Sequence, residues 1–357
     1  MVSERQVSCD HYVEMIRHHV ESQQNGCDAV RRWLEAVVNT EVRSDWEGHA
    51  IPGGVASAHM FFGSRTYGLA LPNSDVDIVF VFPNNLHSVG LSKKTVLKRA
   101  LVRIRASQHC TSVNNAIRSK NTITFRSACL RVDFTVHVGD PAAHSPLALS
   151  RLVREELNKL PPGLRTLCLL TIEWAKTSGV CYNRKGPVSN LLKAVHWLLL
   201  ALAFTVSGEV SAKDCKAETC HPSDKLRELL LFYSKFPFEY RSIDVGMGSV
   251  GSVFKSRSTD QAIPLWLSDP LQSSRNLAQY VDSSSLARIR EACSRGASMV
   301  EIASYWHEKI SLLQKKQETL TPFWEWNLFF AGYGQDSGIT PYFESVIGFK
   351  NINYRQG

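Results

Sequence analysis

The fold of this chain is decided by Phe61-Phe62-Gly63-Ser64-Arg65-Thr66-Tyr67-Gly68, followed closely by Asn73-Ser74-Asp75-Val76-Asp77-Ile78-Val79-Phe80-Val81-Phe82. The second part places two carboxylates, Asp75 and Asp77, at the head of an apolar strand. Strand side chains alternate between faces, so both carboxylates point the same way and can share divalent cations. The first part predicts a strand over residues 59–62 that ends in the Gly63-Ser64 turn.

A third carboxylate comes from a later strand. Apolar and polar side chains alternate strictly between residues 128 and 138, which predicts a half-buried strand with Asp133 on its polar face. Carboxylate oxygens are the ligands that Mg²⁺ (or Mn²⁺) prefers. Two such ions about 3.5–4 Å apart stabilise the attacking and leaving oxygens of an in-line displacement. Asp75, Asp77 and Asp133 therefore predict metal-dependent transfer of a nucleotidyl group.

Two further roles follow from the same residues. Asp133 is suited to accept the proton of an attacking hydroxyl. The Gly63-Ser64 turn can bring N–H groups and a hydroxyl to a triphosphate, where a side chain at position 63 would block the approach. A solvated Asp-x-Asp loop and an ordinary Gly-Ser turn are the simpler alternatives for each part alone. Their combination with a third aspartate favours a site.

The length of 357 residues allows two domains. Prolines at 141, 146, 161 and 162 separate a strand-rich region from one with helical apolar patterns. We therefore expect an α+β fold, in which a small mixed sheet with helices over 45–150 forms the catalytic domain. A mostly helical second domain with an aromatic C-terminal region follows over 151–357, with the catalytic cleft between the two. Residues 1–44 are expected to form a helical segment packed on the helical domain.

Charge and cysteine content narrow the partners and the compartment. The net charge of +8 suits a polyanionic partner, with a solvated basic face as the alternative. Nine cysteines without paired spacing indicate a reducing intracellular compartment, and both cytoplasm and mitochondrion are compatible with it. The apolar run over 191–206 is short for a membrane span and contains Lys193 and His196, so we expect a buried helix and no membrane partner.

These motifs resemble those of the DNA polymerase β-like nucleotidyltransferases. Within them, the chain is most similar to the terminal uridylyltransferases, including those of the RNA-editing type, and to the poly(A) polymerases that extend RNA 3′ ends. The resemblance runs from about residue 55 to about residue 285. Besides the carboxylates it includes the helical segment over 226–236, the pair Asp269-Pro270 and the closing Asn276-Leu277-Ala278. It implies a poly(A)-polymerase-associated-like helical domain.

The resemblance also assigns phosphate and base contacts. Lys176 matches a lysine that contacts the β- and γ-phosphates, but Ile172 stands one turn earlier, so half of the expected cationic clamp is missing. Ser189 matches a phosphate-binding serine. Asn190 follows where the family commonly has a tyrosine that stacks on the base, a contact worth about 1–3 kcal/mol.

The remaining assignments concern the sugar, the base edge and the RNA. The pair His144-Ser145 matches best an Asn-Ser pair that reads the ribose hydroxyl, and Asp269 matches an acidic residue that reads the uracil edge. Its usual glutamate partner is replaced by Gln272. We expect three basic residues before the Asp133 strand to guide the RNA backbone, with a solvated basic loop as the alternative: Arg118, Lys120 and Arg126.

The resemblance therefore implies template-independent addition of nucleotides to an RNA 3′ end. UTP is the favoured donor and ATP the alternative, with Mg²⁺ or Mn²⁺ as cofactor. The metal ligands are intact and the nucleoside pocket is divergent. That divergence favours a second hypothesis, a catalytically weak RNA-binding or scaffold subunit of a larger RNA-processing complex.

Overall fold

The computed structural model describes residues 3–43, 58–82, 92–107, 110–115, 121–127, 130–182, 190–207, 221–245, 253–256 and 263–318. Its largest sheet has five strands in the order β1-β2-β5-β4-β3. Strands β2 and β5 are parallel, and the other neighbouring pairs are antiparallel. The predicted mixed sheet is confirmed. The strands are β1 (Ala58–Phe62), β2 (Val76–Phe82), β3 (Cys110–Asn115), β4 (Thr122–Ser127) and β5 (Leu130–Val138).

The two faces of this sheet have different neighbours. Helices α2 (Gln24–Arg43) and α3 (Lys93–Ala106) cover one face and share a core with the apolar side of β2 and β5. Helix α3 begins after a Ser92 cap, and its buried side consists of Val96, Leu97, Ala100, Leu101 and Ile104. On the other face, Val79 and Val81 pack against Leu147 of α5 (Ser145–Lys159). Asp77, two residues before Val79, shares this second face.

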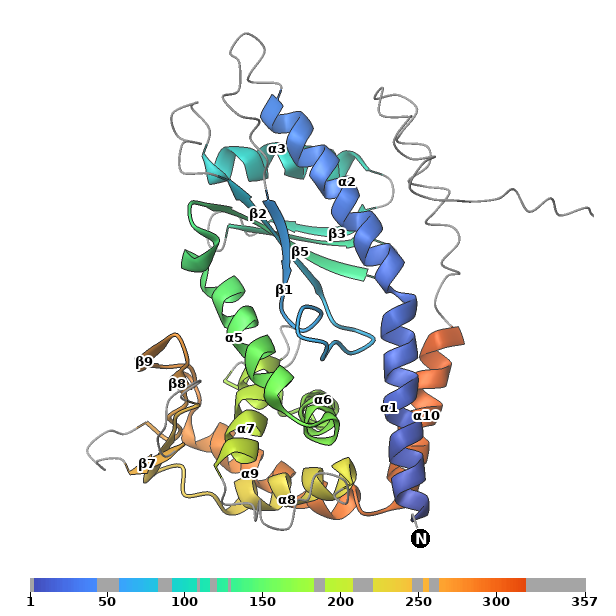
Figure 1. Cartoon of the computed structure of the whole chain (residues 1–357), viewed down its shortest axis with the longest axis vertical. Coiled ribbons are helices and arrows are strands. Elements are labelled where there is room, and N and C mark those ends of the chain that lie inside the picture. The colour runs from blue at the N-terminus through green and yellow to red at the C-terminus, as the bar shows by residue number, and fades with distance from the viewer. Residues whose placement is uncertain are drawn as a thin grey trace, which may run out of the picture.

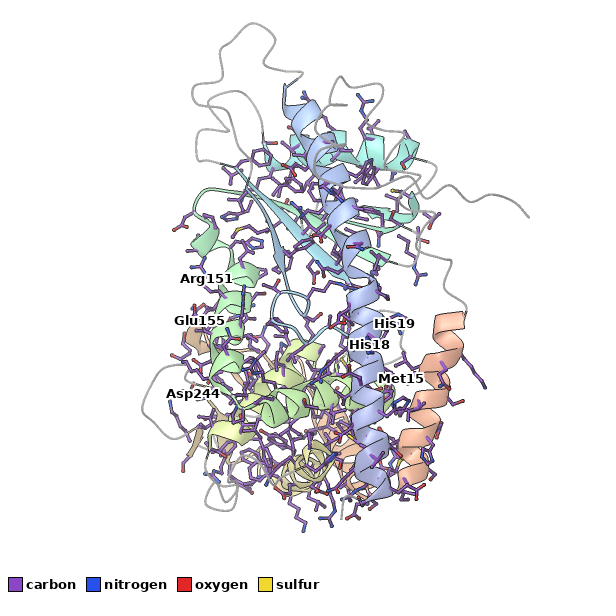
Figure 2. The ribbon with its side chains drawn as sticks, turned by 45° about the vertical axis from the view of Figure 1, so that its right-hand side comes forward. Met15, His18, His19, Arg151, Glu155 and Asp244 are labelled. Carbon is purple, nitrogen blue, oxygen red and sulfur yellow. The ribbon has the colours of Figure 1, made fainter. Side chains whose placement is uncertain are left out.

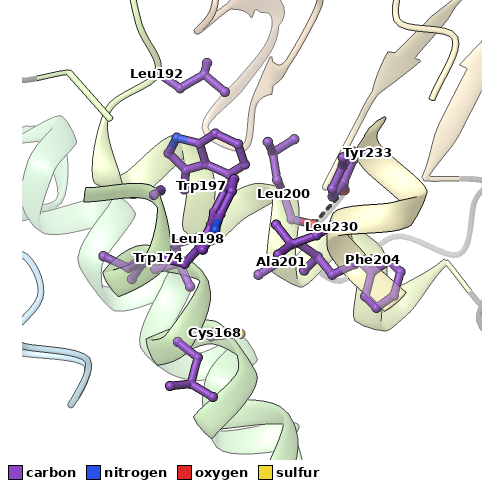
Figure 3. Close-up of a cluster of buried hydrophobic side chains, with 14 of the residues drawn as sticks. Cys168, Trp174, Leu192, Trp197, Leu198, Leu200, Ala201, Phe204, Leu230 and Tyr233 are labelled. Carbon is purple, nitrogen blue, oxygen red and sulfur yellow. Dashed lines mark hydrogen bonds between the residues drawn. The ribbon is translucent and has the colours of Figure 1, made fainter. Parts of the chain in front are cut away.

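Helix α5 leads from the sheet into a helical region (Figures 1 and 2). Arg151 and Glu155 of this helix are labelled in Figure 2. The centre of this region is helix α7 (Ala194–Val206), and almost all of its side chains are buried. Trp197 of α7 meets Trp174 of α6 at 5.4 Å between ring centroids, and the Tyr233 hydroxyl donates to the Leu200 carbonyl at 2.7 Å (Figure 3). The helices are α6 (Pro162–Thr177), α7 (Ala194–Val206), α8 (Pro222–Lys235), α9 (Ser283–Met299) and α10 (Ala303–Glu318).

Short elements complete the architecture. A 3₁₀ turn, η2 (Pro141–Ala143), joins β5 to α5. Two small hairpins, β6 (Arg241–Ile243) with β7 (Phe254–Ser256) and β8 (Ser268–Asp269) with β9 (Gln272–Asn276), lie at the edge of the helical region (Figure 1).

The N-terminal helices connect the two parts. Helix α1 (Glu4–Ser22) lies along α10 and contributes Tyr12 and Ile16 to the helical core, whereas α2 contributes Trp33 and Leu34 to the core of the sheet (Figure 1). At the junction, the Gln23 side chain donates to the Pro72 carbonyl and accepts from Arg65. The first forty residues therefore brace the loop between β1 and β2 as well as the helical region.

Two sequence expectations about the rest of the chain can be placed. The apolar run over 191–206 forms the buried helix α7, and none of the helices described is both long and apolar enough to cross a membrane. The aromatic C-terminal region, from Trp324 onward, lies outside the described residues.

The contact between α6 and α9 gives a stability prediction. A Cβ added to Gly296 would lie 2.5 Å from Nε1 of Trp174, which is 1% exposed and cannot move away. We expect Gly296→Val to lower the free energy of unfolding by about 2 kcal/mol in urea titration, through overpacking. Ser298→Ala changes an exposed position on the same helix and should alter it by less than about 0.5 kcal/mol. Equal stabilities of the two variants would contradict this packing.

Candidate active site

The parallel pairing of β2 and β5 places two carboxylates side by side. Asp77 is the register partner of Asp133, and paired residues of neighbouring strands point to the same face. Asp75, one step before β2, lines the same cavity. This cavity has a volume of about 760 Å³ and lies between the sheet, α6 and the start of α7. The three predicted metal ligands thus border one solvent space.

The Gly63 turn lies directly against one of these carboxylates. Gly63 has φ +74°, and a Cβ there would collide with Oδ2 of Asp77. From the sequence we expected a side chain at position 63 to obstruct a triphosphate. In the structure such a side chain would first collide with the Asp77 carboxylate. The Gly63 N–H donates to the Ser150 hydroxyl at 2.9 Å, so this donor holds the turn to α5. Ser64 lines the cavity as expected.

The environment of Asp77 disfavours its negative charge. Burial, then the Asp133 and Asp75 carboxylates, raise its pKa from 3.8 to about 7, against the opposing effect of Arg131 and Arg65. A buried carboxylate next to two others is a poor anion until a cation compensates it. This electrostatic frustration is what a site for a divalent cation would relieve.

Arg131 is the cation nearest to two of the predicted ligands among the contacts described. Its Nε lies 3.7 Å from Oδ2 of Asp75 and 4.0 Å from Oδ1 of Asp133. Within the described ranges, no group of three His, Cys, Asp or Glu side chains is arranged to hold a metal ion as it stands. The donor set of three carboxylates nevertheless suits Mg²⁺ or Mn²⁺, and binding would require their oxygens to turn from Arg131 toward a shared cation.

Lysines also line this cavity. Lys176 is near the end of α6, where burial lowers its pKa while Cys181 and Asp75 act in the opposite direction. Ile172, one turn earlier, also lines the cavity and offers no charge. Sequence reasoning missed Lys193 and Lys93, which line the same space from the starts of α7 and α3. Two further lysines therefore line the cavity from other elements.

The N-terminus of α7 also borders the cavity. Ala194 and Val195, the first residues of the helix, border the cavity together with Lys193. The N-terminal end of a helix carries partial positive charge and favours phosphate groups. In the sequence, this cation could have been recognised from Lys193, which stands directly before an almost wholly apolar helix.

Rings line the side of the cavity next to α5. His144 caps α5, and its ring centroid lies 5.1 Å from that of His137 and 5.7 Å from that of Phe62. Burial, with His137 and Lys93, lowers the pKa of His144 to about 4, so the imidazole is neutral at pH 7. Its Nδ1 is buried and hydrogen-bonds to no described residue. Tyr67 is a fourth ring that lines the cavity, and it was not among the predicted site residues. Burial and the nearby Asp77 raise the pKa of its hydroxyl.

The other predicted nucleoside contacts do not line this cavity. Ser145 is exposed at the start of α5. Asn190 donates to Oδ2 of Asp282 at 2.9 Å, at the cap of α9. Asp269 is buried, accepts from the Leu271 N–H at 2.9 Å and lies 3.6 Å from Nη1 of Arg275. It also pairs across the β8–β9 hairpin with Gln272.

The predicted RNA contacts are only partly placed. Arg126 is exposed on β4, outside the cavity lining and directly across from Arg131 of β5. Arg118, Lys120 and the predicted phosphate ligand Ser189 lie outside the described residues.

Comparison with known proteins agrees with this geometry. Residues 40–127 match the family model described as "Nucleotidyltransferase domain". Over these residues the chain is similar to nucleotidyltransferase domains. The match includes the Gly63 turn, Asp75 and Asp77 and ends before Asp133, whose place in the site comes from the β2–β5 pairing. No curated protein sequence matches the chain.

Solved structures with this fold extend the comparison to most of the chain. The Cid1 poly(U) polymerase is 16% identical, with a TM-score of 0.61 over 85% of this chain and 95% of its own. A cytoplasmic RNA terminal U-transferase is 17% identical, with a TM-score of 0.60 over 87% and 98%. The protein mtPAP bound to ATPγS is 13% identical, with a TM-score of 0.61 over 86% and 70%. The predicted resemblance is thus confirmed as a likeness of fold.

Two glycines with the same backbone angle test the contact at Asp77. Gly63 and Gly68 both have φ +74°, but nothing lies within 4 Å of a Cβ at 68. We expect either change to alanine to cost about 1–2 kcal/mol of stability from left-handed strain. Only Gly63→Ala should also displace the Asp77 carboxylate and weaken Mn²⁺ binding in calorimetric titration, about tenfold or more. Equal Mn²⁺ affinities in the two variants would show that the turn does not position Asp77.

The raised pKa of Asp77 gives a pH dependence with a defined sign. A carboxyl with a raised native pKa binds more protons folded than unfolded, so its contribution to stability is lost as pH rises from 3.8 through about 7. A bound divalent cation restores this lost stability, because it takes the place of the proton on the carboxylate. We expect the apparent Kd for Mn²⁺ to fall about tenfold per pH unit below 7 and to level off above it. A Kd that is constant between pH 6 and pH 8 would contradict the assignment.

Proposed function

We propose that this protein is a template-independent RNA 3′-terminal nucleotidyltransferase that adds UMP from UTP. The observation that carries the proposal is the register pairing of Asp77 with Asp133, which puts both beside Asp75 on a cavity also lined by three lysines. A cavity lined by both carboxylates and cations suits a metal-bound nucleoside triphosphate. The match to a nucleotidyltransferase domain model over residues 40–127 supports this use.

The proposed reaction is attack of the terminal RNA hydroxyl on the α-phosphorus, with pyrophosphate as the leaving group. Mg²⁺ or Mn²⁺, when bound by Asp75, Asp77 and Asp133, would supply positive charge to the phosphate oxygens. Asp133 is the residue proposed to accept the hydroxyl proton. Lys176, Lys193 and the N-terminus of α7 would bind the β- and γ-phosphates, and Ser64 would contact the same groups.

The nucleoside would bind among the rings beside α5. His144 lines this space as a neutral imidazole, which can accept a hydrogen bond from a ribose hydroxyl. Tyr67, Phe62 and His137 border the same space and can contact the base in place of the tyrosine that Asn190 replaces. UTP is the favoured donor because two similar structures are named as a poly(U) polymerase and a terminal U-transferase. ATP is the alternative, since mtPAP was solved with ATPγS as well as with UTP.

A specific observation also favours the second candidate, a catalytically weak RNA-binding or scaffold subunit. Two side chains that the family resemblance assigns to the nucleoside, Asn190 and Asp269, are engaged with Asp282 and Arg275. Thermal denaturation separates the candidates, because a ligand that binds only the native state raises the melting temperature. A shift with UTP or ATP and Mg²⁺ supports the enzyme, and no shift at about millimolar nucleotide supports the scaffold.

Primer extension tests the enzyme directly. With a 5′-labelled RNA primer and Mg²⁺, we expect extension with UTP and slower extension with the other three triphosphates. Asp75→Asn with Asp77→Asn should reduce the rate at least about 10³-fold, because the cation is lost while side-chain volume is kept. Thermal denaturation serves as the folding control for this variant. Extension with ATP alone would overturn the UTP assignment, and retained activity of the double variant would overturn the metal ligands.

A further inference from the structure

Arg131 lies among the predicted metal ligands, and the proposed function assigns it no role. It precedes Asp133 by two residues on β5, so both side chains share one face of the sheet. Its Nε is within ion-pair distance of both Asp75 and Asp133, at 3.7 and 4.0 Å. Its side chain is 34% exposed, so it is also accessible from the solvent.

The contacts of Arg131 are of a kind that can be exchanged. Its Nε is buried and hydrogen-bonds to no residue that the structure describes. Strong arginine–carboxylate pairs are bidentate, with two short N–H···O bonds, whereas these Nε contacts are 3.7 Å or longer. Charge therefore holds the guanidinium in place more than directional bonding does. A divalent cation that needs oxygens of Asp75 and Asp133 competes with Arg131 for the same atoms.

A second arginine stands directly beside it. Arg126 of β4 is the register partner of Arg131 in the antiparallel β4–β5 pair, and it is exposed. Like charges directly opposite on neighbouring strands repel each other. A phosphodiester between two guanidinium groups removes that repulsion and accepts hydrogen bonds from both.

We propose that Arg131 is a positioning residue that exchanges partners when a divalent cation binds. It pairs with Asp75 and Asp133 as long as no divalent cation takes their oxygens, and it then binds, with Arg126, a phosphodiester near the 3′ end of the acceptor RNA. This inference rests on the proposed function, since it assumes the same metal ligands and an RNA acceptor. Cation binding and RNA binding are then coupled, and each strengthens the other.

The first test measures Mn²⁺ affinity by isothermal titration calorimetry, without nucleotide or RNA. Removing the competing charge with Arg131→Gln should tighten Mn²⁺ binding about tenfold. Arg131→Lys keeps the charge and should stay within about threefold of the wild type. Arg126→Gln removes an equal charge from the neighbouring, exposed position and should have a smaller effect than Arg131→Gln. Unchanged or weaker Mn²⁺ binding by Arg131→Gln overturns the proposal.

The second test measures RNA affinity by fluorescence anisotropy with a short single-stranded RNA at fixed ionic strength, without triphosphate. Wild-type protein should bind this RNA about fivefold or more tightly with Mn²⁺ than with EDTA, because the cation releases Arg131. Arg131→Gln should lose this gain. A gain of equal size in the variant would show that Arg131 does not contact RNA and would overturn the proposal.

Failure of the proposed function looks different from failure of this inference. If the protein is not an RNA nucleotidyltransferase, the wild type extends no primer with any triphosphate, whatever the Arg131 variants do in calorimetry. If Asp77→Asn has no effect on Mn²⁺ affinity, or the wild type binds no Mn²⁺, both proposals are overturned.

Discussion

The parallel pairing of β2 with β5 is the constraint on which the rest of the structure depends. In this register Asp77 stands beside Asp133, and a shift of one residue would move one carboxylate to the opposite face, into the core under α2 and α3. Burial of Ile78, Phe80 and Phe134 on that opposite face makes such a shift costly. The hydrophobic core of the sheet therefore fixes the positions of the acidic groups on its other face.

A second set of contacts holds the surrounding loop and helices to this pair. Gly63 approaches the Asp77 carboxylate so closely that no side chain fits, and its N–H is tied to Ser150 of α5. Arg65 joins Gln23, at the junction of α1 and α2, to the Ser74 carbonyl just before Asp75. The turn, the N-terminal helices and α5 thus act together on a few atoms of the site. On the far side, the packing of Trp174 against Gly296 and Trp197 holds the helix that carries Lys176.

Sequence patterns predicted the features that depend on local periodicity. A continuous apolar run located β2, and alternation of apolar and polar residues located β5. The common orientation of Asp75 and Asp77 followed as well, because side chains two residues apart on a strand point to the same face. Side chains that meet only through tertiary packing were not predictable in this way. Lys193 lines the cavity because α7 begins there. Arg131 lies beside Arg126 only because β5 pairs with β4. Asp269 was assigned to the nucleoside by resemblance, yet its contacts are with its own hairpin and Arg275.

The central claim is that Asp77 and Asp133 share a divalent cation across the two paired strands. Mn²⁺ binding to the Asp77→Asn and Asp133→Asn variants and to the double variant, followed by electron paramagnetic resonance, tests it most directly. If the two carboxylates hold one ion, each single change removes most of the affinity and the double change adds little, since effects at a shared site are not additive. Independent, additive losses, or an Asp133→Asn variant that binds Mn²⁺ as the wild type does, would contradict the account.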